Sequence, residues 1–150
     1  MAVDQNDNPE NDKDKYKLDD QVGFNLRLAY QRHMAIFSEH MSGNLTAMQF
    51  STLIRLTDTD GPVSQNALGR LVGMDAATTK GVISRLLARD LVHIERDAVD
   101  RRRYLLSTTE KGRELLAQVL PDVRQITEET LSPLGPSERR SLLKLLKKIN

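Results

Sequence analysis

The sequence predicts a mainly α fold with one small β-hairpin, and three stretches of the chain predict it. Residues 91–112 contain two short segments of alternating apolar and polar residues, 92–96 and 102–107, on either side of a polar turn, which is the pattern of a β-hairpin. Before it, residues 63–89 have the pattern of two short helices joined by a tight turn. Apolar residues also recur at helical spacing near both ends of the chain. Together these elements describe a winged helix-turn-helix, mainly α with a β-hairpin wing, plus terminal helices.

The first residues differ in composition from the rest of the chain. Residues 1–18 are rich in Asp, Asn and Lys and nearly lack apolar side chains, so they cannot bury surface to offset the entropy lost on ordering. We expect them to form a disordered acidic tail. Residues 1–20 contain seven acidic and three basic residues, which gives them a net charge of −4. Because the whole chain has a net charge of +1, residues 21–150 carry a net charge of +5.

Two helices are expected to follow the tail. Apolar residues at intervals of three and four predict a helix over residues 20–41, and Ser-Gly-Asn at 42–44 ends it. We assign residues 19–45 to an N-terminal dimerisation helix. The next helix begins at Thr46, whose hydroxyl can cap it while Gln49 reaches back.

Two further caps place the helix-turn-helix. Ser64 can cap one helix and Asp75 the next, with Gly73 and Met74 in the turn between them. On the second helix one face is apolar and the other is short, polar and basic. The outer face holds Ala77, Thr78, Lys80, Gly81, Ser84 and Arg85. The winged helix-turn-helix is predicted to span residues 46–108.

The C-terminal part, residues 109–150, is predicted to form dimerisation helices. Thr109 can cap a helix that Pro121 should kink or end, and residues 131–136 form a linker. The last helix, residues 137–149, carries an apolar stripe that so small a domain cannot cover. A second copy of the chain in a two-fold homodimer is the simplest cover.

The outer face of the second helix suits double-stranded DNA. Thr can contact base edges, Lys and Arg can reach guanine or phosphate, and Gly81 permits close approach. The hairpin tip adds a charged cluster to this face: Asp100, Arg101, Arg102 and Arg103. Two alternatives remain: an ordinary solvated helix, and a solvated turn in which Glu95, Asp97 and Asp100 balance the arginines. The acidic tail could also compete with DNA phosphates for the basic surface.

The sequence resembles the multiple antibiotic resistance regulator (MarR) family from about residue 21 to 149. The resemblance rests on the following residues: Leu86, Asp90, Leu91, Val92, Asp97, Asp100, Arg101, Arg102, Thr109 and Gly112. They match a helix ending in Gly-Leu-Val, a wing written Asp-Pro-x-Asp-x-Arg, and a following Leu-Thr-x-x-Gly. Three positions depart from that pattern: Asp90 stands for the usual glycine, Ala98 for proline and Thr108 for leucine. Asp tolerates a left-handed helix cap, Ala98 makes the tip less rigid, and Thr108 weakens one core contact.

The resemblance also implies a ligand, because family members bind phenolic or carboxylate compounds between the dimerisation helices and the winged domain. The first helix offers aromatic and cationic groups that suit a small aromatic acid: Arg27, Tyr30, His33 and Phe37. The alternative is that Tyr30, His33 and Phe37 form dimer core with their polar tips satisfied locally. The run QVGFNLRLAYQRHMAIF also resembles regulators of aromatic or nicotinate-type acid breakdown.

Several classes of function are excluded or disfavoured. The chain has no Cys, so neither disulfides nor thiol redox sensing is available. His33 and His40 lack the i, i+4 pairing and acidic cluster of a metal site, and no nucleophile motif or phosphate loop appears. We therefore expect no enzyme activity, no metal and no cofactor. Without a bilayer-spanning run or signal sequence, no membrane association is predicted and the protein should be cytoplasmic.

These observations predict a sequence-specific, DNA-binding transcriptional regulator. We expect a homodimeric repressor on a pseudo-palindromic operator, released by a small aromatic or phenolic acid effector. The alternatives are an architectural DNA-binding protein without ligand response and a winged domain used only for protein contacts.

Overall fold

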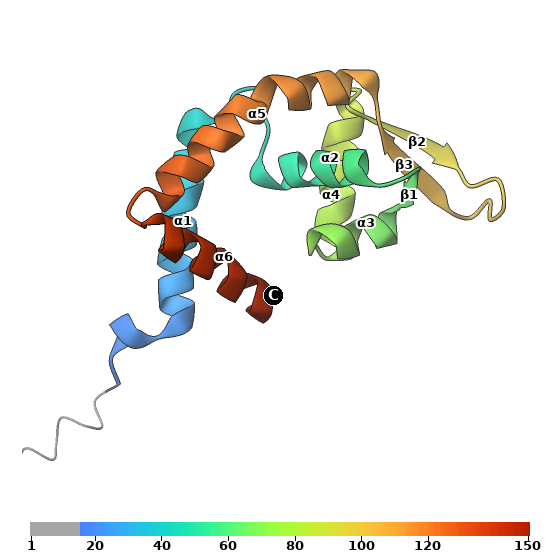
Figure 1. Cartoon of the computed structure of the whole chain (residues 1–150). Helices are drawn as coiled ribbons and strands as arrows, with labels where there is room; N and C mark the ends of the chain where they lie inside the picture. The colour runs from blue at the N-terminus through green and yellow to red at the C-terminus, as the bar shows by residue number, and fades with distance from the viewer. Residues whose placement is uncertain (1–15) are drawn as a thin grey trace, which may run out of the picture.

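The computed structural model describes residues 16–150 and arranges them as a winged unit and a helical arm joined by one long helix (Figure 1). A short 3-10 helix, η2 (Leu18–Asp20), precedes the arm. The helical arm consists of α1 (Val22–His40), α5 (Glu110–Leu131) and α6 (Pro136–Ile149). The winged unit consists of α2 (Ala47–Asp58), β1 (Val63–Ser64), α3 (Gln65–Val72), α4 (Ala76–Ala88), β2 (Val92–Arg96) and β3 (Tyr104–Thr108). Residues 1–15, most of the predicted tail, lie outside the described residues.

Local capping residues set the helix starts, as predicted. Thr46 and Gln49 form a complete capping box on α2. Ser64 caps α3 through the amide of Ala67, and Asp75 caps α4 through the amide of Thr78. Each cap satisfies a backbone donor that the first helical turn leaves without an intrahelical partner.

The wing is an antiparallel hairpin inside a three-stranded sheet of order β1-β3-β2. β2 has the predicted bounds, but its partner begins at Tyr104 rather than at residue 102. The prediction was wrong there because the turn is longer: the carbonyl of Asp100 accepts from the amide of Arg103, whose carbonyl accepts from the amide of Asp97. β1 was not predicted, since two residues are too few to show alternation.

The winged unit has a core of its own. Leu53, Leu68 and Leu86 are fully buried, at 0% exposure, where α2, α3 and α4 meet. Thr108 is also buried, and its hydroxyl pairs with that of Thr57 at 3.0 Å. The departure from leucine thus places a buried hydroxyl, which has a hydrogen-bond partner, where an apolar side chain was expected.

α5 runs unbroken through Pro121 and bends along its length (Figure 1). It packs against α1 around a small core of Ile36, Phe37 and Ile126. Arg32 donates to the carbonyls of Glu129 and Thr130 at 3.0 and 2.7 Å, which ties α1 to the C-terminal part of α5.

α6 contains no buried residue. Its apolar stripe remains open to solvent in the single chain, with Leu143 48% and Leu145 57% exposed. Within residues 16–150, no helix combines the length and the apolar character needed to cross a membrane.

Candidate functional site

The outer face of α4 is open and lightly charged. Thr79, Val82, Ile83 and Leu86 are buried, which turns the opposite face to solvent. On that face Ala77, Lys80, Ser84 and Arg85 are exposed, while Thr78 and Gly81 are half-buried. A Cβ at Gly81 would meet nothing within 4 Å. The glycine is therefore not required by packing within this chain, and it leaves room for an external surface.

Asp75 begins this face. The pKa of Asp75 lies below its usual value, mainly because its carboxylate accepts a hydrogen bond from the amide of Thr78 and, to a smaller extent, one from the Thr78 hydroxyl. The ionised carboxylate accepts the Thr78 amide at 2.7 Å. It also lies at the positive end of the helix dipole, so the start of α4 is well defined.

The tip of the wing is ordered by two aspartates. Asp100 accepts from the amide of Arg102 at 3.1 Å and from its Nε at 3.3 Å. Asp97 accepts from the amide of Val99, and its carboxylate lies 3.9 Å from Nε of Arg103. The side chain of Arg102 is nevertheless 92% exposed. Asp100 thus pairs with Arg102, and the pairing leaves the guanidinium facing solvent.

Three of the four candidate ligand residues of α1 form a row of rings, with His33 between Tyr30 and Phe37 at centroid distances of 6.5 and 6.4 Å, but they do not all line one cavity. Nδ1 of His33 lies 2.9 Å from the Thr130 hydroxyl. Phe37 belongs to the core with Ile36 and Ile126. Arg27 lies over the ring of Phe24 at 5.4 Å. Phe37 and Arg27 line neither of the two cavities described next.

A cavity of about 540 Å³ separates α1 from the start of α2 and the outer face of α4. Its lining residues are Tyr30, Met34, Thr46, Ala47, Met48, Ala77, Thr78, Gly81, Val82 and Arg85. Four of the six residues predicted to face DNA on α4 therefore border the same space as Tyr30. Sequence reasoning had kept the two groups apart, because only the fold brings α1 beside α4.

A second, mainly apolar cavity of about 440 Å³ lies between α1, α5 and α6. Tyr30 and His33 line it from α1, Thr130 from α5, and Leu143 from α6. It is continuous with the exposed leucines of α6.

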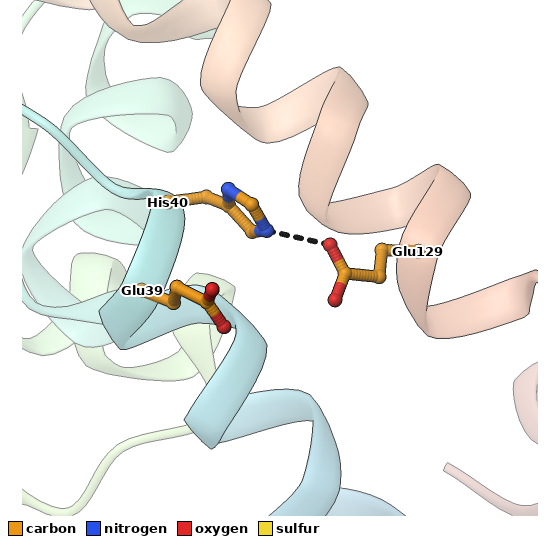
Figure 2. A group of neighbouring side chains, drawn as sticks. All are labelled: Glu39, His40 and Glu129. Atoms are coloured by element: carbon orange, nitrogen blue, oxygen red, sulfur yellow. Dashed lines mark hydrogen bonds and ion pairs between the residues drawn. The ribbon is translucent and has the colours of Figure 1, made fainter.

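Sequence reasoning also missed two arrangements around the end of α1. His40 has an acidic surround after all: its Nε2 lies 2.5 Å from Oε2 of Glu129, and Glu39 is adjacent (Figure 2). Nearby, Asp122 accepts from the amide of Ser42 at 2.9 Å and from its hydroxyl. Both partners come from α5, far along the chain, so no local signal could have found them.

The turn between α1 and α2 is also tied to α4. The guanidinium of Arg89, at the end of α4, donates to the carbonyls of Gly43 and Asn44 at 2.8 and 2.7 Å. Gly43 has a φ of +71°, and a Cβ there would lie 2.9 Å from the side chain of Leu115 on α5. Glycine is therefore required where this turn passes between the winged unit and the arm.

The MarR family model matches residues 44–103, which cover most of the winged unit. The HTH-type transcriptional repressor NicR of Pseudomonas putida is 42% identical over 139 residues, covering 92% of this chain and 87% of NicR.

Two solved structures have the same fold over nearly their whole length. A probable transcriptional regulator from Pseudomonas aeruginosa superposes with a TM-score of 0.86 at 44% identity, covering 89% of this chain and 100% of that one. BpsR of Bordetella bronchiseptica, whose DNA binding is regulated by 6-hydroxynicotinic acid, superposes with a TM-score of 0.85 at 41% identity, covering 90% and 96%. Sequence and structure agree, and the chain belongs to the MarR family.

Proposed function

We propose that this protein is a homodimeric transcriptional repressor that binds a pseudo-palindromic DNA operator and releases it when a small aromatic acid binds. The observation that carries the proposal is the cavity shared by α1 and the outer face of α4. A ligand there would touch the surface that contacts DNA. The protein acts by binding and not by catalysis, as do the repressor and regulators it resembles.

The DNA-binding surface consists of the outer face of α4 and the tip of the wing. Lys80 and Arg85 are positioned on α4 to contact base edges or phosphates, and Arg102 extends from the wing. Asp100 orients Arg102 for a narrow minor groove, where arginine is favoured. Two copies of α4 related by a two-fold axis would enter major grooves about 10 base pairs apart, or a multiple of that spacing.

The exposed apolar surface of the helical arm supports the homodimer. Exposed leucines of α6 and the apolar cavity beside them form a contiguous patch, of the kind that marks a protein interface. A second copy of the same helices would cover it by two-fold symmetry. In this arrangement Tyr30 lies beside both the ligand and the dimer interface, and His33, which packs near Tyr30, lies beside the interface.

The effector is a planar ring carrying a carboxylate. Arg85 and Tyr30 line the cavity together; a guanidinium is a bidentate partner for a carboxylate, and a phenol offers both a ring face and a hydroxyl. An Arg85 side chain engaged by the ligand is no longer available to DNA. The DNA binding of BpsR is regulated by 6-hydroxynicotinic acid, which has this chemistry.

The test starts from genomic fragments selected by the full-length protein. The selected sites should contain an inverted repeat, and 6-hydroxynicotinic acid or a related aromatic acid should weaken binding to them. By linkage, operator DNA should weaken ligand binding by the same factor. Tyr30→Phe and His33→Ala should blunt the response to ligand while leaving affinity for ligand-free DNA largely intact.

Two results would overturn parts of the proposal. Selected sites without an inverted repeat, or a monomer as the active species, would remove the two-fold binding mode. Calorimetry that detects no binding across a panel of aromatic acids, with operator affinity unchanged in their presence, would favour an architectural DNA-binding protein.

A further inference from the structure

We propose that Glu39, His40 and Glu129 form a binding site for a divalent transition metal ion of the zinc class. One donor atom from each residue, an imidazole nitrogen and two carboxylate oxygens, lies within 4.8 Å of the other two. Figure 2 shows the three side chains converging between the end of α1 and α5. Both the donor types and their placement on two rigid helices favour a metal ion.

The spacing of the donors fits a small ion. Zn²⁺ binds imidazole and carboxylate donors at about 2.0–2.2 Å, which places neighbouring donors of a tetrahedral site roughly 3.3 Å apart. Nε2 of His40 and Oε2 of Glu129 are 2.5 Å apart and bridged by a hydrogen bond. An ion that displaces the bridging proton needs these atoms to separate by less than an ångström. Glu39 is exposed, so its carboxylate can rotate to complete the third position.

The electrostatic surround is suited to a cation. Two carboxylates, those of Glu39 and Glu129, face the single imidazole of His40. Arg32 is the nearby permanent cation on α1, but its guanidinium is engaged by the backbone carbonyls of Glu129 and Thr130. The carboxylate of Glu129 is left to His40 and to an ion.

The donor set also selects among metals. Imidazole combined with carboxylate favours Zn²⁺ and its transition-metal neighbours, whereas Mg²⁺ and Ca²⁺ prefer oxygen donors alone. Three protein ligands on a partly exposed site leave one tetrahedral position to water.

The site lies where it can stiffen the molecule. It joins the last residues of α1 to α5, directly before the turn that Asp122 and Arg89 hold. A bound ion would fix the end of α1 against α5 and so restrict the turn into the winged unit. The three metal-site residues belong neither to the proposed DNA-binding face nor to either cavity. The metal-site proposal can therefore be tested independently of the proposed repressor function.

Isothermal titration of Zn²⁺ into the chelator-treated, full-length protein tests the site. We expect one ion per chain, and Co²⁺ in its place should show the intense visible absorption of a tetrahedral complex. Removing an outer-shell partner of a metal site costs 10–100-fold in affinity, so loss of a ligand in His40→Gln or Glu129→Gln should cost at least about 10-fold. Glu39→Gln should cost less, because Glu39 is the most exposed donor.

His93→Gln is the matched control, because it makes the same exchange at an exposed histidine on β2, outside the cluster. Circular dichroism of the metal-free variants establishes that each one is folded. Zn²⁺ binding that His40→Gln and His93→Gln leave equally strong would overturn the site, as would a folded parent protein that binds no Zn²⁺ in the micromolar range. Mg²⁺ binding as strongly as Zn²⁺ would contradict the donor assignment.

Discussion

The winged unit and the helical arm differ in how far one chain completes them. In the winged unit Leu53, Leu68 and Leu86 are at 0% exposure, whereas on α6 Leu143 and Leu145 are about half exposed. The same residue type thus closes a core in one region and forms an open surface in the other. A single copy of the chain completes the core of the winged unit, whereas the apolar face of α6 stays open in it.

This difference separates two kinds of substitution. Changes in the core of the winged unit should act on the free energy of unfolding, whatever the protein concentration. Changes on α6 should act through the dimer, and their effect should depend on protein concentration, because partner binding stabilises the folded state by mass action.

The largest expected effect is on stability. Leu86→Ala should lower the free energy of unfolding by about 2–5 kcal/mol, the range for a buried leucine that leaves a cavity. Leu145→Ala removes the same atoms from an exposed site, and its effect should shrink as the protein is diluted, because the parent then loses its partner as well. Urea unfolding at two protein concentrations measures both. A concentration-independent loss at Leu145 would mean that α6 is completed within one chain.

The next effect concerns the outer face of α4. Lys80→Ala and Arg85→Ala should each weaken operator binding by about 1–3 kcal/mol if the side chains contact bases, with little loss on random DNA. Lys144→Ala removes the same charge on α6, outside α4 and the wing, and serves as the control. Binding measured against salt should follow a slope near −0.9 per neutralised phosphate. Equal losses on operator and random DNA would limit Lys80 and Arg85 to phosphate contacts.

The wing provides a test in which the sign of the change decides. Asp100 and Arg102 form an exposed pair, which contributes only about 0–1 kcal/mol to stability, so neither alanine variant should alter thermal unfolding much. Arg102→Ala should weaken operator binding strongly. Asp100→Ala should also weaken it, although it removes a negative charge beside DNA, because Arg102 loses its orientation. Tighter binding by Asp100→Ala at the same salt would reduce the wing to a basic patch.

Local signals predicted much of the fold. The caps at Thr46, Ser64, Asp75 and Thr109 are each completed by a residue three positions along, so a short window of sequence contains both partners. The left-handed conformation expected at Asp90 is also present, with φ of +56°.

What sequence reasoning missed depends on contacts between distant segments. The hydrogen bond of Thr108 was not foreseen, because its hydroxyl partner, Thr57, lies 51 positions away. His40 was judged to lack acidic neighbours, because Glu129 lies 89 positions away. Gly112 matched the family pattern, but no feature of the sequence supplied a physical reason for a glycine there. The structure gives the reason, because a Cβ at this position would lie 2.3 Å from the carbonyl oxygen of Leu91.

The smallest expected effect compares one aspartate from each region. Asp75 in the winged unit and Asp122 in the arm both have a pKa held below 3.8, Asp75 chiefly by the amide of Thr78 and Asp122 chiefly by the hydroxyl of Ser42. A lowered folded pKa contributes stability that is present above the unfolded value and is lost as pH falls through the folded one. Unfolding of the parent should therefore become easier below about pH 4.

Asp75→Asn and Asp122→Asn should each flatten that acid dependence, with little change at neutral pH because asparagine can still accept the same hydrogen bonds. Urea unfolding between pH 7 and pH 3 measures the slope, and amide hydrogen exchange assigns it to a region. Any change in protection should be confined to Thr78 in the Asp75 variant and to Ser42 in the Asp122 variant, since these amides donate to the two side chains. If either substitution lowered the protection of both amides, the winged unit and the arm would open as one cooperative unit. The two regions would then differ in the exposure of their leucines but not in how they unfold.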